Sequence, residues 1–136
     1  MRLYLDANTI IYGIECVEPF HRTVIARTLA AESENEGVLI TSLLSRIECR
    51  TKPTRDRNTK LLAKYDEFFA RRRLLLNDLS APIIDLATDL RARYNFKTPD
   101  AIHIATALCA NADLVLTGDA ALTRCKELKF EVLREG

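Results

Sequence analysis

Four acidic side chains stand where the chain could bring them together. Asp6 directly follows the apolar segment 2–5, and Asp119 follows a second apolar segment. Asp100 begins a stretch that is otherwise almost free of charge, and Glu48 lies among apolar neighbours. Carboxylates packed together repel one another unless a cation lies between them. Because oxygen ligands without nearby His or Cys suit Mg²⁺ or Mn²⁺, the pattern indicates a metal site.

Each acid taken alone also has a structural explanation. Asp6 could cap the helix that follows it, and Asp119 could be a turn or cap residue. Asp100 could be a favourable charge at a helix N-terminus, and Glu48 could be a surface residue. The joint pattern favours a shared cleft, because functional groups gather beyond the carboxyl ends of parallel strands, where the strand order reverses.

Short apolar runs alternate with longer amphipathic segments along the chain. The pattern predicts strands at residues 2–5, 38–41, 74–76, 113–117 and 130–133. It predicts helices at residues 7–16, 21–35, 42–50, 58–72, 80–93 and 98–111. Ser80 and Thr98 are expected to act as helix caps, Pro53 to stop a helix, and residues 51–58 to form a loop. Alternating strands and helices predict a single α/β domain over residues 1–136, with a parallel sheet covered on both faces.

Composition excludes several other functions. The chain has 136 residues and a net charge of +1, and its four glycines are too scattered for a P-loop or dinucleotide-binding loop. The four cysteines lack CxxC spacing, which makes a structural zinc site improbable. No run of some twenty apolar residues and no signal-peptide pattern is present, so we expect no membrane segment and a cytoplasmic location.

The segments that carry the four acids resemble the acidic motifs of PIN domains. They are Leu3-Tyr-Leu-Asp-Ala-Asn-Thr-Ile-Ile11, Ile47-Glu48, Thr98-Pro-Asp-Ala-Ile-His-Ile-Ala-Thr-Ala107 and Leu116-Thr-Gly-Asp119. The resemblance is to VapC-type toxins of bacterial toxin–antitoxin pairs and spans nearly the whole chain. The segment around Glu48 is the least specific of the four, and Cys49 stands where many relatives carry an aliphatic residue.

The resemblance implies a fold, an activity and partners. The fold is a PIN-like domain with about five parallel strands, and the activity is endoribonuclease cleavage that depends on Mg²⁺ or Mn²⁺. The acidic positions of the family fall on Asp6, Glu48, Asp100 and Asp119, and its small polar residues fall on Asn8 and Thr117. A small antitoxin and a homodimer are the implied partners. An apolar stripe on residues 58–69 or 21–32 could supply the dimer contact.

A basic segment follows the second motif. Residues 46–73 carry ten basic and four acidic side chains, a net +6, which leaves −5 for the rest of the chain. We expect the basic side chains nearest Glu48 to bind RNA phosphates; they are Arg50, Lys52, Arg55 and Arg57. A solvated basic surface without a ligand is the alternative.

Three other functions stay open at this point. A PIN-type nuclease could process RNA as a housekeeping enzyme without an antitoxin. A haloacid-dehalogenase-like phosphohydrolase also places an aspartate after its first strand, but it wants a second aspartate two residues later, where this chain has Asn8. A nucleic-acid-binding module with an inactive site is the non-enzymatic alternative, and the presence of all four acids argues against it.

Overall fold

The computed structural model of the chain describes residues 1–134 and contains one parallel sheet. Its five strands are β1 (Arg2–Leu5), β2 (Val38–Ser42), β3 (Leu74–Asn77), β4 (Leu114–Thr117) and β5 (Phe130–Val132). They lie in the order β3-β2-β1-β4-β5, and each neighbouring pair is parallel. The prediction of an α/β fold with about five parallel strands is confirmed.

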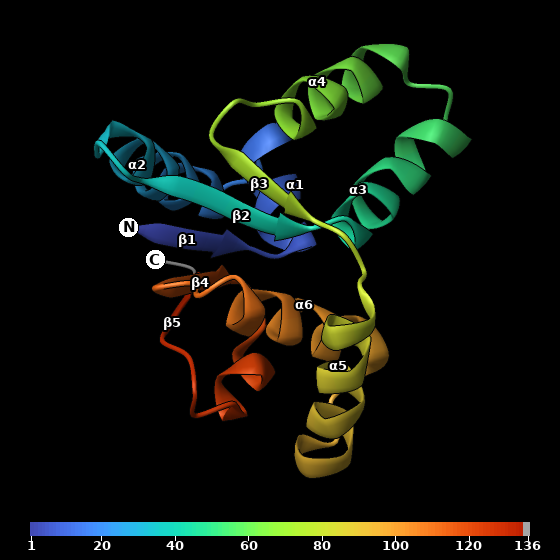
Figure 1. The fold of residues 1–136 in the computed structure, drawn as a ribbon. Helices are drawn as coiled ribbons and strands as arrows, with labels where there is room; N and C mark the ends of the chain where they lie inside the picture. The colour runs from blue at the N-terminus through green and yellow to red at the C-terminus, as the bar shows by residue number, and fades with distance from the viewer. Residues whose placement is uncertain (135–136) are drawn as a thin grey trace.

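Helices cover both faces of this sheet (Figure 1). They are α1 (Ala7–Ile14), α2 (Phe20–Ser33), α3 (Leu44–Arg55), α4 (Thr59–Phe69), α5 (Ala81–Tyr94) and α6 (Thr98–Cys109), with a short 3₁₀ helix at Ala120–Arg124. The helices α1, α2 and α4 lie on one face with α3 packed beside them, and α5 and α6 lie on the other. The sheet is therefore a middle layer, as both-sided burial of a parallel sheet requires.

The apolar residues of β1 alternate between these two layers. Leu3 and Leu5 pack in the core that contains α1, α2 and α4. Tyr4 points the other way, into a cluster with Ile40 of β2 and Ala107 of α6. Because successive side chains of a strand face opposite sides, one short strand supplies both cores. The phenol of Tyr4 is thereby placed on the α6 side of the sheet.

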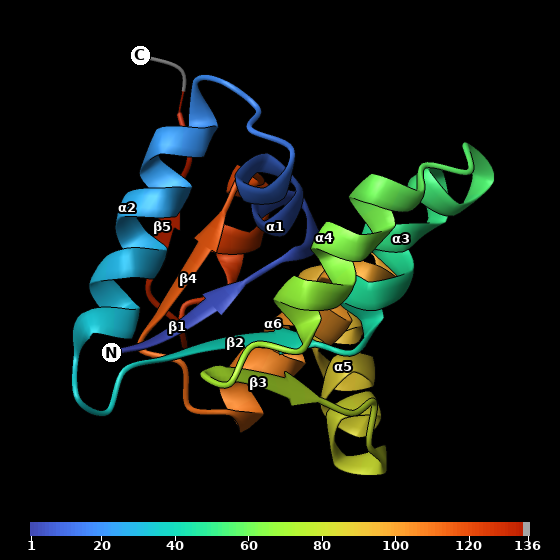
Figure 2. The ribbon, with the colours of Figure 1, turned by 90° about the horizontal axis from the view of Figure 1, so that it is seen from above.

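The direction in which strands are added reverses beside β1. The chain places β2 and then β3 on one side of β1, and afterwards β4 and β5 on the other side, as Figure 2 shows from above. Leu5 of β1 is in register with Leu116 of β4, so both strands end at the same edge of the sheet. Asp6 and Asp119 follow these two ends. This is the edge at which open α/β sheets place their functional groups.

Two helix boundaries differ from the prediction. Pro53 does not stop α3, which continues to Arg55, so most of the predicted loop 51–58 is helical. Proline costs a helix one hydrogen bond and crowds the preceding turn; here its ring is buried, which offsets part of that cost, and the helix ends two residues later. Thr98 is the first residue of α6 and not its cap, since the cap position is Lys97, which makes no side-chain cap bond.

The apolar stripe on residues 58–69 is not available as a dimer surface. Tyr65, Phe68 and Phe69 of α4 are buried in the core. On α2, by contrast, Ile25 and Leu29 are exposed. None of the helices within residues 1–134 is long and apolar enough to cross a membrane.

Candidate active site

A threonine hydroxyl joins the first and the fourth acidic motif. Thr117 ends β4, and its Oγ1 donates a hydrogen bond of 2.5 Å to Oδ2 of Asp6, which directly follows β1. The same oxygen accepts a 3.0 Å bond from the backbone N–H of Asp119. Thr117 is completely buried, and its hydroxyl connects these two segments. It thus lies where the sequence placed it, between the acids.

The other carboxylate oxygen of Asp6 caps α1. The backbone N–H of Thr9 donates to Oδ1 at 3.0 Å, and Thr9 Oγ1 in turn donates to the carbonyl of Leu116 in β4 at 2.8 Å. Asp6 is buried and satisfies an otherwise unpaired donor at the helix N-terminus. The structural and the functional explanation of Asp6 are therefore compatible. Asn8, in contrast, is exposed and makes no side-chain hydrogen bond within residues 1–134.

Asp100 lies in the first turn of α6 and faces the same edge of the sheet. Partial burial raises the pKa of its carboxyl above the ordinary value, and the negative charges of Asp119 and Asp6 raise it further. His103 and Lys97 act in the opposite direction. Asp119 is half-buried and caps the 3₁₀ helix by accepting from the N–H of Ala121 at 2.9 Å. Three of the four acids thus share one electrostatic environment.

Glu48 is connected to the site through a histidine. Oε1 of Glu48 on α3 lies 2.7 Å from Nε2 of His103, which stands one turn after Asp100 on α6. The other ring nitrogen, Nδ1, lies 2.7 Å from the phenol oxygen of Tyr4. Tyr4 and His103 are buried, whereas the side chain of Glu48 is 31% exposed. Burial raises the pKa of the Tyr4 phenol well above its usual value, and the charges of Asp6 and Glu48 add to this effect.

The donor chemistry of this site fits a hard divalent cation, but the side chains as placed do not surround one. Carboxylate oxygens are the preferred ligands of Mg²⁺ and Mn²⁺. In the part of the chain that the structure describes, no three His, Cys, Asp or Glu side chains lie close enough together to hold an ion. Both oxygens of Asp6 are engaged in hydrogen bonds. The residues thus fit the metal by type.

The basic side chains after Glu48 divide into two groups. Arg50 forms an ion pair with Asp66 of α4 at 3.1 Å, and Lys52 forms one with Asp56 at 3.3 Å. Arg55 and Arg57 are exposed and form no ion pair with an acid of residues 1–134. Of these four basic side chains, we therefore expect Arg55 and Arg57 to be the two available for binding RNA.

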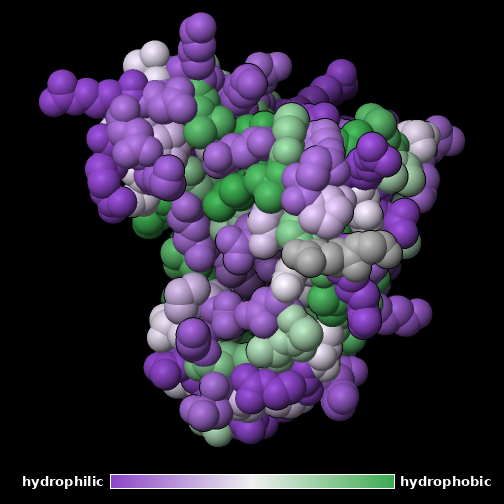
Figure 3. Space-filling model, turned by 180° about the vertical axis from the view of Figure 1, so that it is seen from behind, coloured by the Kyte–Doolittle hydropathy of each residue, from purple (hydrophilic) through white to green (hydrophobic). Residues whose placement is uncertain are grey.

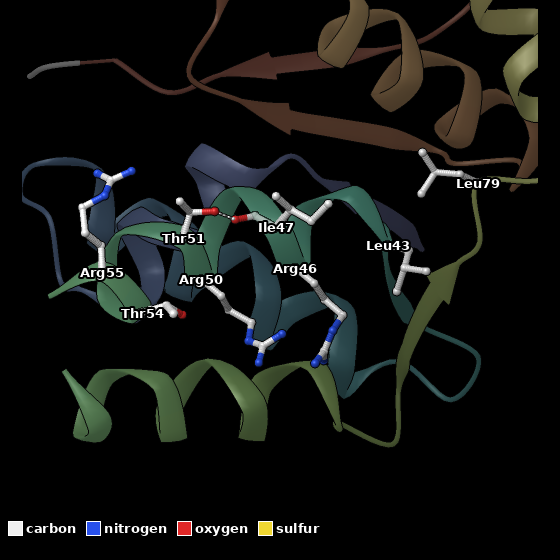
Figure 4. Close-up of a pocket in the computed structure, with 8 residues that line it drawn as sticks. All are labelled: Leu43, Arg46, Ile47, Arg50, Thr51, Thr54, Arg55 and Leu79. Atoms are coloured by element: carbon white, nitrogen blue, oxygen red, sulfur yellow. Dashed lines mark hydrogen bonds between the residues drawn. The ribbon is translucent and has the colours of Figure 1, made fainter. Parts of the chain in front are cut away.

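A cavity of about 710 Å³ lies along α3 but does not include the acids. Figure 4 shows Arg46 and Arg50 directed toward α4 and Arg55 directed away from it. The guanidinium of Arg46 lies 5.4 Å from the ring centre of Phe69, a cation–π distance. Arg46 and Arg50 thus contribute to the packing of α3 on α4. In Figure 3 the molecular outline narrows between this pair of helices and the α5–α6 layer, and both hydrophilic and hydrophobic side chains are visible there.

Sequence reasoning missed three polar residues that support the acids. These residues are His103, Tyr4 and Thr9, none of which the sequence analysis assigned to the site. A buried tyrosine on β1 and a histidine one turn after an acid give no pairwise signal in a single sequence. Only the parallel pairing of β1 and β2 and the packing of α6 on the sheet bring these groups together.

Comparison with known proteins identifies one family model and a set of similar folds. The PIN domain model matches residues 3–128. The structure of VapBC2 from Rickettsia felis, bound to a promoter DNA fragment, has a TM-score of 0.77 at 19% identity, with 98% of this chain and 100% of that chain covered. VapBC-1 from nontypeable Haemophilus influenzae has a TM-score of 0.74 at 19% identity, with 98% of each chain covered.

A third similar structure is VapC20 from Mycobacterium tuberculosis, described as a toxin that cleaves the sarcin–ricin loop. Its TM-score is 0.70 at 15% identity, with 90% of this chain and 93% of that chain covered. At such identities these likenesses concern the fold. A search of curated protein sequences found no match.

Proposed function

Because this chain belongs to the PIN-domain family, we propose that it is a divalent-metal-dependent endoribonuclease of the VapC type. One observation carries the proposal: the hydroxyl of Thr117 ties Asp6 to the segment of Asp119, and both lie at the edge of the sheet where the strand order reverses. The family match leaves the haloacid-dehalogenase-like alternative without support.

The four acids have distinct roles in this proposal. Asp6, Asp100 and Asp119 would hold Mg²⁺ or Mn²⁺ directly or through water, and Glu48 would be a further ligand or would orient the attacking water. A bound metal would supply a water of lowered pKa and would offset the negative charge that builds on the phosphoryl oxygens. Thr117 and Thr9 keep the Asp6 carboxylate in place by donating to its two oxygens, Thr9 through its backbone N–H. We propose that Asn8, which is exposed, contacts metal-bound water or RNA and not the acids themselves.

The proposed activity is tested by incubating the purified protein with total RNA, with Mg²⁺ or Mn²⁺ and with EDTA. Cleavage at defined internal sites that requires the metal supports it, and mapping of the new ends identifies the substrate. Hydrolysis of small phosphate monoesters without RNA cleavage would contradict it. RNA binding without cleavage in either metal would instead identify an inactive binding module.

The two exposed arginines at the end of α3 and just beyond it, Arg55 and Arg57, are expected to contact RNA phosphates. Replacing Arg55 and Arg57 together by Ala should weaken RNA binding and lower the slope of log K against log salt by about 1.4, since each phosphate contact on single-stranded nucleic acid contributes about 0.7. The measurement is a salt titration of RNA binding in EDTA. Arg50 and Lys52 should contribute less, because each is already paired with an acid.

The control variant loses the same number of positive charges as the Arg55→Ala/Arg57→Ala variant, but at positions away from the candidate site. Arg72 and Lys129 are exposed and precede β3 and β5, at the edge of the sheet opposite the acids. The Arg72→Ala/Lys129→Ala variant should leave the salt slope unchanged. Equal salt slopes for the wild type and both double variants would show that the basic side chains after Glu48 form a solvated surface and do not bind RNA.

We further propose that the chain forms a homodimer and binds a small antitoxin. The support is the similarity in fold to proteins solved as VapBC complexes. Exposed apolar side chains suited to such contacts are Ile25 and Leu29 on α2 and Ile47 on α3. Light scattering of the isolated protein measures the oligomeric state, and a small gene directly upstream in the genome would distinguish a toxin from a housekeeping RNA-processing enzyme.

A further inference from the structure

We propose that Tyr4 and His103 are positioning residues that hold the Glu48 carboxylate in place through a hydrogen-bonded chain of fixed direction. The chain runs from the Tyr4 phenol to Nδ1 of His103, and from Nε2 of His103 to Oε1 of Glu48, with 2.7 Å at each link. It crosses three elements, since Tyr4 lies in β1, His103 in α6 and Glu48 in α3. This proposal rests on the proposed function, because it assigns how one acid of that site is oriented.

The direction of the chain follows from what each group can donate. A carboxylate only accepts, so Nε2 of His103 must carry a proton toward Glu48. A neutral imidazole has one N–H, which leaves Nδ1 as an acceptor for the Tyr4 hydroxyl. The reverse tautomer would set an unprotonated Nε2 against the Glu48 carboxylate, two acceptors 2.7 Å apart with no proton between them. Buried polar groups are almost always paired, and only one arrangement pairs all of these.

Burial makes this chain a rigid support and not a surface contact. Tyr4 is completely buried, His103 is 4% exposed, and the two rings pack edge to face at 5.9 Å between their centres. Glu48 lies on α3, and its side chain is partly open to solvent. A partly exposed glutamate loses rotamer freedom when a fixed donor holds it. Groups that orient a functional carboxylate in this way are characteristically worth 10- to 100-fold in activity or metal affinity.

The proposal predicts a spectroscopic signature in the protein without metal or RNA. Long-range ¹H–¹⁵N NMR should show the neutral form of His103 as a single tautomer, protonated at Nε2 and accepting at Nδ1. The chain has one other histidine, His21, so a His21→Gln variant assigns the two rings. A neutral His103 protonated at Nδ1, or averaged between tautomers like a free imidazole, would overturn the proposed direction.

The kinetic test removes one hydroxyl. Tyr4→Phe keeps the buried ring, and kcat for RNA cleavage should fall about 10- to 100-fold with KM unchanged, because orientation of Glu48 affects the reaction more than the binding of RNA. Tyr65→Phe is the matched control, since Tyr65 is equally buried and its phenol donates to Glu15, outside the site. It should cleave RNA within about twofold of the wild-type rate.

Two amide variants test the direction in which His103 reaches. His103→Gln can place an amide nitrogen near the former Nε2 and should keep more activity than His103→Asn, which reaches only the former Nδ1. Equal kcat for Tyr4→Phe and wild type, or more activity in His103→Asn than in His103→Gln, would overturn the positioning role. Wild-type protein that does not cleave RNA would instead refute the proposed function, while the NMR result would still decide whether the hydrogen-bonded chain exists.

Discussion

Replacing Asp6 or Asp100 by Asn is expected to lower the rate of RNA cleavage by about 100- to 1000-fold, the scale on which single electrostatic groups act in catalysis. The substitution keeps the size of the side chain and removes the charge that a hard cation requires. The fold should persist, because the amide oxygen of Asn at position 6 can still accept from the N–H of Thr9. The measurement is the rate of cleavage of a mapped RNA oligonucleotide in Mn²⁺ or Mg²⁺, with circular dichroism to confirm folding.

The control for this prediction is Asp85→Asn. Asp85 is an exposed acid on α5, so its replacement removes one negative charge without touching the candidate site. This variant should cleave at the wild-type rate. A folded Asp6→Asn/Asp100→Asn double variant that cleaves RNA at full rate would show that the site lies elsewhere.

Asp100→Asn should make the metal-free protein more stable even though it disables the enzyme. Burial raises the pKa of Asp100, and the charges of Asp119 and Asp6 raise it further, so the ionised carboxyl is under strain in the fold. The helix N-terminus offsets about 0.3–1 kcal/mol of this penalty. Removing the charge therefore relieves strain, a conflict between stability and function that is common at active sites.

The sign of the pH dependence follows from the raised pKa. Between the unfolded and the folded pKa of Asp100, the native state binds more protons than the unfolded state, so stability falls as pH rises through this window. Above the folded pKa the penalty is fully present and constant. The melting temperature of Asp100→Asn in EDTA should therefore exceed that of wild type at pH 7, and the difference should shrink as pH is lowered through the window.

Divalent metal should reverse this order. At a hundredfold excess over Kd, Mg²⁺ stabilises the wild type by about 2.7 kcal/mol, whereas Asp100→Asn should gain much less. Thermal unfolding of the wild type and Asp100→Asn at pH 7, in EDTA and in millimolar Mg²⁺, gives the four melting temperatures to be compared. If Asp100→Asn melts lower in EDTA and both proteins respond equally to Mg²⁺, Asp100 is a helix-start residue and not part of a metal site.

The five strands could be predicted because each is a short apolar run that a parallel sheet buries on both faces. The end of α3 and the burial of the apolar side chains of α4 could not be predicted from the sequence. Pro53 normally ends a helix, and local rules do not register that its ring is buried in the tertiary structure. The apolar stripe of α4 was one of two segments predicted as possible dimer contacts, but Phe68 and Phe69 pack inside the domain because the α3–α4 pair folds back onto α1.

The parts of the candidate site that lie at the ends of strands could be predicted from the sequence. The contact that depends on how two helices pack could not. Asp6, Thr117 and Asp119 follow from the ends of β1 and β4, and the structure joins them through one hydroxyl. The contact between Glu48 and His103 depends on how α3 and α6 pack at the end of β2, which a single sequence does not encode in any local pattern. The identity of the metal ligands remains a proposal that the substitutions above test.

The candidate site depends on the pairing of β1 with β4, and β4 lies near the end of the chain. The site can therefore form only late in the synthesis of the protein. Asp6 and Thr117 are separated by 111 positions, which a ribosome adds in roughly 6 to 22 s at about 5–20 residues per second. Until β4 has been made and has inserted beside β1, the nascent chain has neither the hydroxyl that holds Asp6 nor Asp119. Contacts between such distant parts of a chain also form slowly. A protein that attacks RNA would thus be harmless to the machinery translating it for most of its own synthesis.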